Sequence, residues 1–177
     1  HIEEQIHQVQ KSQEYRQPAR LYWNGHGVPG GAGFVSVPPE RVGPDFAKPM
    51  VGRGSAFGDL DGDGDLDVVI SQVQGEPLVL RNDQRLGHHW VRFQLQGTRS
   101  NRDAIGAWIQ LTVKGRVLWR QVMPTRGYLS QSELPVTIGL GDSTAIDEVQ
   151  VQWPGGRRQR LSGVRIDALN RVLESDP

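Results

Sequence analysis

The chain has 177 residues, enough for one large β domain or two small ones, and its twenty basic and twenty acidic residues leave a formal net charge of zero. A chain without net charge does not attract DNA, RNA or an anionic membrane electrostatically, so a nucleic-acid partner is not expected. The absence of cysteine excludes disulfides, thiolate metal sites and cysteine nucleophiles.

Glycine and proline punctuate the whole sequence. With 22 glycines, 11 prolines and valine-rich runs between them, the composition predicts short strands joined by tight turns, and therefore an all-β fold. No apolar run reaches the roughly 18 residues of a membrane span, so none is expected. The first residues, His1 to Glu4, lack the pattern of a signal peptide. We therefore expect a chain that begins after processing or a fragment of a longer protein.

The first half predicts one helix and several short strands. Ile2, Ile6 and Val9 recur at helical spacing, which predicts an amphipathic helix from about Ile2 to Ser12. Its apolar stripe is expected to pack on its own domain, and a partner-binding helix is the alternative. Strands are expected at 21–23, 34–37, 55–58, 68–71 and 78–82, with an irregular connector over 42–54.

A glycine-rich segment between the first two strands, residues 25–30, matches the G-x-G-x-x-G pattern of dinucleotide sites. That pattern binds a pyrophosphate only where the glycines open a helix, whereas Pro29 and the following glycines lead into a strand. We therefore expect no dinucleotide site, and we interpret His26 as a solvated loop residue.

Longer alternating strands follow a polar hinge at residues 82–88. Val91, Phe93 and Leu95 share one face, residues 107–113 repeat the alternation, and Lys114-Gly115 predicts a tight hairpin turn. Further strands are expected at 117–123, 136–140, 149–153 and 171–173. This half predicts a small antiparallel β-sandwich or barrel, and we place the domain boundary near residue 87, giving domains 1–87 and 88–177.

The most distinctive stretch runs from residue 59 to residue 67, where aspartates alternate with other residues, two of them glycines. Neighbouring carboxylates held near 4 Å repel by about 4 kcal/mol per pair at an effective dielectric constant of about 20, so a compact form needs a cation. Oxygen ligands without His or Cys suit Ca²⁺. The expected metal ligands are Asp59, Asp61, Asp63, Asp65 and Asp67.

The loop differs from an EF-hand. With Asp59 as the first position, Gly64 falls where the chain must bend sharply, and Asp65 is expected to coordinate through its backbone carbonyl. The twelfth position, which would be Glu in an EF-hand, is Ile70 inside an apolar run. We expect a strand to leave the loop directly, with calcium in a structural role; an acidic, solvated turn without metal is the alternative.

Two family resemblances follow from these motifs. Residues 57–67 together with 75–77 resemble an FG-GAP (VCBS-type) repeat, the calcium-binding blade of integrin-like β-propellers, with Glu76 in place of the usual alanine. Residues 15–34 resemble the end of a preceding blade. The second half resembles the ASPIC/UnbV domain, found in many bacterial exported proteins, on the segments 89–92, 97–107, 127–132, 139–141 and 153–156.

These resemblances imply a partial β-propeller with one calcium loop, followed by a small β domain. They imply an exported protein, extracellular or periplasmic, where calcium is abundant, and they bring no catalytic residue to transfer. A partial propeller leaves open strand edges, which can pair with another chain.

No residue pattern predicts catalysis. His88, His89 and the Arg102-Asp103 pair have the right side chains for acid or base chemistry, but no catalytic motif accompanies them. We therefore expect a protein that is not an enzyme, and a hydrolase remains as an alternative. The short basic cluster at residues 157–160 is interpreted as a solvated turn and strand edge.

Aromatic and arginine side chains in the second half predict a ligand surface. Trp108 alternates with Ile109 and should face away from the core, and aromatic rings beside arginines can bind sugars or acidic groups. The expected ligand-binding residues are Trp108, Trp119, Arg120, Arg126 and Tyr128. The alternative is that loops or another domain cover both sheet faces.

The sequence as a whole predicts an exported, calcium-binding protein for adhesion, matrix or surface interaction, with a protein or glycan ligand. Two alternatives remain at this point. One is a self-assembling extracellular filament subunit that completes its propeller edges from a neighbour, and the other is a glycan-binding module.

Overall fold

The computed structural model describes residues 4–25 and 33–175, and the chain divides into two compact units. The first unit comprises residues 1–55 and 69–80, and the second comprises residues 56–68 and 81–177. The aspartate loop (residues 59–67) therefore belongs to the second unit. The domain boundary expected near residue 87 stays a prediction.

The described residues are nearly all in strands and loops, which confirms the all-β class. The strands are β1 Tyr22–Asn24, β2 Phe34–Ser36, β3 Gly52–Gly58, β4 Asp67–Gln72, β5 Leu78–Leu80, β6 His89–Gln96, β7 Trp108–Val113, β8 Arg116–Gln121, β9 Val136–Gly141, β10 Glu148–Gln152, β11 Arg158–Leu161 and β12 Leu169–Leu173. The helical segments are α1, Ile6–Val9, and the 3₁₀ helix η1, Pro39–Arg41.

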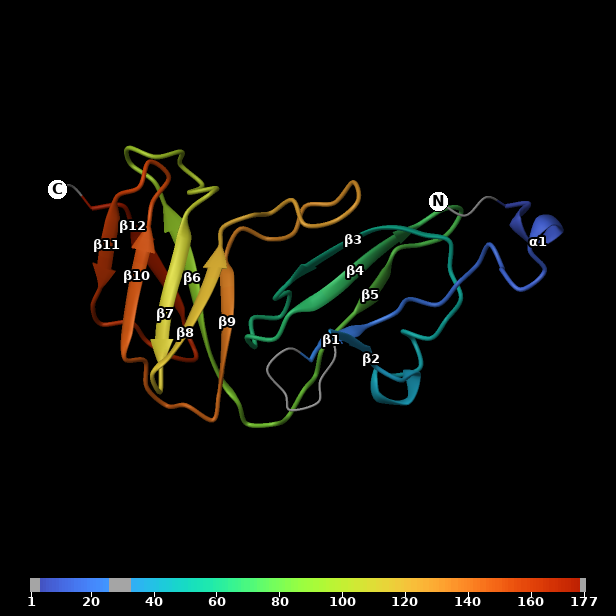
Figure 1. The fold of residues 1–177 in the computed structure, drawn as a ribbon, viewed down its shortest axis with the longest axis horizontal. Coiled ribbons are helices and arrows are strands. Elements are labelled where there is room, and N and C mark those ends of the chain that lie inside the picture. Colours follow the sequence, from blue (N-terminus) through green and yellow to red (C-terminus); the bar gives the residue numbers. More distant parts are fainter. Residues whose placement is uncertain (1–3, 26–32, 176–177) are drawn as a thin grey trace. The chain divides into compact units, whose positions relative to one another are not determined.

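The second unit is built around a β-sandwich (Figure 1). One sheet has the order β11-β10-β7-β8 and the other the order β12-β6-β9. Among the described residues no sheet closes into a barrel, so the sandwich is the alternative that holds. The apolar residues that alternate along the strands fill the space between the sheets, with Phe93, Ile109, Leu111, Ile138 and Trp153 almost fully buried.

Strand pairing differs from the expected antiparallel pattern in one place. β12 pairs in parallel with β6, placing Leu169 beside Arg92 and Leu173 beside Gln96. The prediction of a purely antiparallel domain was wrong because β6 ends at Gln96 and its partner β12 begins only at Leu169, and the local alternation of residues does not reveal which distant strands pair. β11 was also absent from the predicted strands, since Leu161 is its only apolar residue.

The hairpin between β7 and β8 confirms the predicted tight turn. Lys114 and Gly115 both have positive φ, 49° and 70°, as a type I′ turn requires. The pairing then runs in register from Val113 with Arg116 to Trp108 with Gln121.

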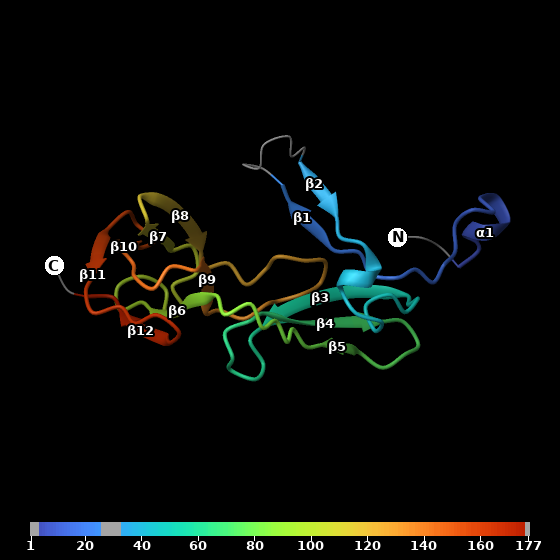
Figure 2. The same ribbon diagram turned by 90° about the horizontal axis from the view of Figure 1, so that it is seen from below.

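The first unit contains the hairpin β1–β2, whose strands lie side by side (Figure 2). Residues 26–32 lie outside the described part of the chain, so the structure does not test the expectation for His26 or for most of the glycine-rich segment. β3, β4 and β5 form a three-stranded sheet in that order, close to the predicted strands. Their assignment to a propeller blade stays a proposal, as does self-association through open strand edges.

Helix α1 is shorter than predicted. It spans four residues where the sequence predicted a helix to Ser12, and Val9 is 83% exposed. No side chain caps its N-terminus, and a helix of this length has little stability of its own. The expected packing of an apolar stripe was therefore wrong for the described residues of this helix, none of which is buried.

Candidate metal centre

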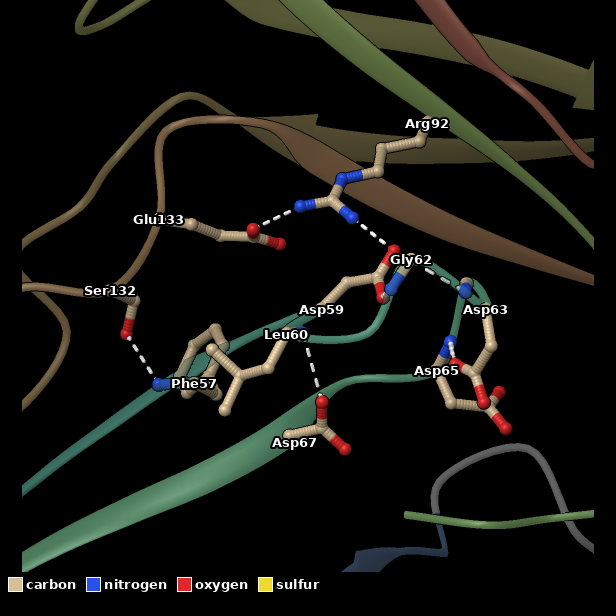
Figure 3. A network of polar contacts seen from close by, with 11 residues as sticks. Phe57, Asp59, Leu60, Gly62, Asp63, Asp65, Asp67, Arg92, Ser132 and Glu133 are labelled. Carbon is tan, nitrogen blue, oxygen red and sulfur yellow. Dashed lines mark hydrogen bonds and ion pairs between the residues drawn. The ribbon is translucent and has the colours of Figure 1, made fainter. Parts of the chain in front are cut away.

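The aspartate loop folds around its own carboxylates (Figure 3). Asp59 follows β3, and its Oδ1 accepts a hydrogen bond from the Gly62 N–H at 2.7 Å while its Oδ2 accepts one from the Gly64 N–H at 3.3 Å. Gly62 and Gly64 have φ of 82° and 95°, a region that glycine enters without steric cost. The glycines thus allow the backbone to bend so that both N–H groups point at the Asp59 carboxylate.

Three carboxylates meet at the start of this loop. Asp59, Asp61 and Asp63 each offer an oxygen, and these atoms lie within 4.8 Å of one another. Asp59 has a buried side chain, whereas Asp61 and Asp63 are exposed. Arg81 Nη1 lies 3.8 Å from Asp61, but both side chains are partly in solvent, where such a pair contributes at most about 1 kcal/mol. The three carboxylates therefore form a compact anionic cluster.

The other two predicted ligands have protein partners. Asp67 is buried, and its two oxygens accept hydrogen bonds from the N–H groups of Leu60 at 2.9 Å and Asn82 at 2.8 Å. The side chain of Asp65 accepts a hydrogen bond from Gln84 Nε2 at 2.7 Å. The structure therefore brings together three of the five predicted side chains, and coordination by Asp67 or by the Asp65 carbonyl stays a prediction.

Arg92 connects the loop to the sandwich. Its guanidinium lies between two carboxylates, with Nη1 paired to Asp59 Oδ2 and Nη2 paired to Glu133 Oε2 (Figure 3). Arg92 stands in the middle of β6, and Glu133 lies in the connection between β8 and β9. Residues from three separate parts of the second unit thus form one ionic group.

Trp90 is a second contact between the aspartate loop and the sandwich. A Cβ atom added at Gly64 would overlap the indole ring of Trp90, so this ring packs directly against the loop backbone. Trp90 and Arg92 alternate with the buried Val91 and Phe93 along β6. The outer face of the β12-β6-β9 sheet therefore carries the loop.

The end of β3 is held by the same connection. The Phe57 N–H donates to Ser132 Oγ at 3.2 Å, and the Glu133 N–H donates to the Phe57 carbonyl at 3.3 Å. Arg126 from this connection lies over the Phe57 ring, 5.8 Å from its centre.

Desolvation raises the pKa of Glu133, and the positive charge of Arg92 opposes that increase.

Sequence reasoning did not identify Arg92, Trp90 or Glu133. The available signal was a charged residue at an outward position of a strand whose inward positions are all apolar. Such a residue usually faces solvent, and only the three-dimensional placement of the loop, 33 residues earlier in the chain, gives it a buried partner.

The donor set fits a hard divalent cation. Three carboxylate oxygens at this spacing can share one ion, and oxygen donors are those that Ca²⁺ prefers. Near Asp59, the buried Oε1 of Glu133 has no hydrogen-bond partner, which leaves an additional acceptor unsatisfied. If Ca²⁺ binds, Asp59, Asp61 and Asp63 would hold it, and its positive charge would neutralise the loop.

The outer face of the four-stranded sheet carries the predicted aromatic residues. Trp108 and Trp119 are 39% and 44% exposed, and their rings meet edge to face with centroids 6.3 Å apart. Both rings are therefore partly exposed among the described residues, and cover of this face by another domain stays an alternative. The register places four glutamines on the same face, because they pair across the strands with the two tryptophans or with each other: Gln110, Gln121, Gln150 and Gln152.

The remaining predicted ligand residues do not join this surface. Arg120 pairs with the inward-facing Ile109 and therefore lies on the opposite side of β8 from Trp119. Arg126 donates hydrogen bonds to the carbonyls of Met123 and Gln121, both at 2.8 Å. Tyr128 is half exposed in the connection between β8 and β9.

His89, one of the titratable residues considered for catalysis, contacts an acidic side chain. Its Nδ1 lies 2.7 Å from Asp167 Oδ2, and a hydrogen bond from His89 is the main cause of a lowered pKa of Asp167.

Within the described residues, no helix is both long and apolar enough to cross a membrane.

Comparison with known proteins finds a family match in the second half of the chain. Residues 97–177 match the family described as ASPIC and UnbV, which confirms this part of the expected resemblance. The FG-GAP resemblance of the aspartate loop has no such match and stays a proposal.

Similar proteins include cartilage acidic protein 1 of Mus musculus, 35% identical over 141 residues, and of Homo sapiens, 34% identical over the same length. Both alignments cover 76% of this chain. The chain corresponds to only 21% of the length of these relatives.

Proposed function

We propose, from the match of residues 97–177 to the ASPIC and UnbV family, that this chain is part of an exported interaction protein of the extracellular or periplasmic space whose aspartate loop binds Ca²⁺. The relatives are named for cartilage, a tissue made largely of extracellular matrix, which supports a role in adhesion, matrix or surface interaction. The protein acts by binding a protein or glycan rather than by catalysis.

The observation that carries the calcium proposal is the meeting of Asp59, Asp61 and Asp63 within 4.8 Å. In this proposal the residues are the ligands of an FG-GAP-type loop, and calcium has a structural role. It removes the repulsion among the carboxylates and fixes the connection between β3 and β4. Because Trp90 and Arg92 attach this connection to β6, the bound ion also stabilises the second unit.

Calcium should raise the melting temperature of the chain. At a calcium concentration about tenfold above the dissociation constant, one site stabilises the folded state by about 1.4 kcal/mol. For a chain of this size, that corresponds to an increase of about 3–6 °C. Scanning calorimetry with calcium or with a chelator measures the effect.

The double substitution Asp61→Ala plus Asp63→Ala should abolish the calcium-dependent increase. Asp45→Ala is the matched control, because Asp45 is an exposed aspartate outside the loop that pairs only with Lys48. A calcium response that survives the double substitution would exclude the site, and so would a wild-type chain whose melting temperature is the same in calcium and chelator.

A second candidate function, glycan binding, is favoured by the outer face of the β11-β10-β7-β8 sheet. Two exposed tryptophans can stack on sugar rings, and the glutamines beside them can donate and accept hydrogen bonds with sugar hydroxyls. Their arrangement on neighbouring strands gives a broad surface that suits an extended oligosaccharide, and the charged Glu148, Arg158 and Arg160 border it on β10 and β11.

Trp108→Ala should weaken binding to any oligosaccharide found on a glycan array by about 5- to 30-fold, because loss of one stacking ring removes about 1–2 kcal/mol. Val117→Ala, an exposed apolar residue on the neighbouring strand, is the control for a general loss of surface area. An array without ligands, or a ligand indifferent to Trp108, would remove this candidate function.

A further inference from the structure

The ionic group around Arg92 has more negative than positive charge. One guanidinium is shared by two carboxylates, and all three side chains are largely buried, with exposures of 11% for Arg92, 1% for Asp59 and 19% for Glu133. Among the described residues, Glu133 Oε1 and Arg92 Nε are buried without hydrogen-bond partners. The group is therefore one positive charge short of neutrality.

Arg92 compensates the one carboxylate of the cluster Asp59, Asp61 and Asp63 that is buried. Asp61 and Asp63 are exposed and can be stabilised by water, whereas Asp59 is buried and needs a positive partner inside the protein. The guanidinium supplies that charge from β6, and the N–H groups of Gly62 and Gly64 complete the hydrogen bonds of this carboxylate. Contacts with Arg92, Gly62 and Gly64 thus hold Asp59 beside Asp61 and Asp63.

We propose that Arg92 is the built-in counter-ion of the aspartate loop and sets its cation affinity. Arg92 allows the loop to fold before a cation arrives, and the same positive charge opposes the binding of a divalent cation at Asp59. The inference rests on the proposed calcium site and adds its regulation. Because such coupling is reciprocal, a bound cation should also weaken the hold of Arg92 on Asp59.

Removing the charge of Arg92 should therefore have two opposite effects. The chain without calcium should lose stability, because Asp59 and Glu133 would be buried without a positive partner. The affinity for calcium should rise, because the cation would become the only strong counter-charge for Asp59. If Arg92 served only to position Asp59, removing its charge would instead lower the affinity for calcium.

The experiment compares wild type, Arg92→Gln and Arg92→Lys as full chains by calorimetric calcium titration and by melting in calcium and in chelator. Arg92→Gln should bind calcium about tenfold more tightly than wild type, within the usual range for coupled sites. Its melting temperature should also depend more strongly on calcium. Arg92→Lys retains the charge and should stay near wild type. Arg171→Gln is the matched control, since Arg171 lies on the neighbouring strand β12 and contacts Gln94.

If Arg92→Gln does not fold in chelator, the single variant Glu133→Gln is compared with the double variant Glu133→Gln plus Arg92→Gln. This pair tests the same loss of the Arg92 charge with one fewer buried carboxylate. Weaker or unchanged calcium affinity after loss of the Arg92 charge would overturn the counter-ion inference, while calcium binding by wild type would still support the proposed function. Absence of calcium binding in wild type and in every variant would instead overturn the proposed function itself.

Discussion

Replacing Glu174 with Gln should lower the free energy of unfolding by about 3 kcal/mol, because this buried carboxylate accepts several charge-assisted hydrogen bonds. Glu174 Oε2 accepts from the backbone N–H groups of Thr98 at 3.0 Å, Arg99 at 3.0 Å and Ser100 at 2.9 Å. Glu174 Oε1 accepts from Ser100 Oγ at 3.1 Å. An amide in the same place would turn an NH₂ group toward some of these donors.

The carboxylate joins two distant parts of the sandwich. Residues 98–100 follow β6, and Glu174 follows β12, the strand that pairs in parallel with β6. The Glu174 N–H also donates to the Gln96 carbonyl at 2.8 Å. The substitution should therefore loosen β12 first, which hydrogen exchange of the β12 amides would detect alongside chemical denaturation.

A matched control is Glu148→Gln. Glu148 pairs with Arg160 at the exposed face of the four-stranded sheet, where an ion pair contributes at most about 1 kcal/mol. Equal losses of stability from the two substitutions would contradict the role assigned to Glu174.

The same carboxylate should make stability depend on pH. Desolvation raises the pKa of Glu174, but the hydrogen bonds from Ser100, Arg99 and Thr98 together lower it from its ordinary value of 4.5 to about 2. A carboxylate with a lowered pKa in the folded state stabilises the protein above its ordinary pKa. The difference in stability between wild type and Glu174→Gln should therefore be full above pH 4.5 and shrink as the pH falls toward 2.

Most strands of the sandwich were predictable because the alternation of apolar and polar residues lies within each strand. Ile109, Leu111 and Val113 alternate with polar residues, and the structure buries all three. The turn at Lys114-Gly115 was also readable, since two residues between alternating strands favour a tight hairpin. Periodicity of two and turn chemistry both act within a few residues, so the sequence displays them directly.

The features that escaped prediction depend on contacts between distant residues. Asp59 and Arg92 are 33 residues apart, and Arg92 and Glu133 are 41 residues apart. The spacing of the aspartates predicted the clustering of Asp59, Asp61 and Asp63, but nothing in it indicated that Asp67 would accept hydrogen bonds from Leu60 and Asn82. A pattern of aspartates identifies the loop, whereas the fold decides which protein groups contact each carboxylate.

Replacing Gly64 with Ala should destabilise the second unit far more than replacing Gly62. Both glycines have positive φ, and an alanine in that region costs roughly 1–2 kcal/mol at either position. At Gly62 an added Cβ would meet no atom within 4 Å, whereas at Gly64 it would overlap the Trp90 ring. Overpacking of this kind typically adds about 1–3 kcal/mol.

The comparison of these two neighbouring substitutions isolates the contact between the aspartate loop and β6. Chemical denaturation should give Gly64→Ala an additional loss of about 1–3 kcal/mol over Gly62→Ala. In a Trp90→Ala background the extra loss should disappear, because the ring that the new methyl group meets is gone. Equal losses for the two glycines in the wild-type background would mean that the loop does not rest on Trp90. The coupling between the aspartate loop and the sandwich would then depend on Arg92 and on the contacts of Phe57 with Ser132 and Glu133.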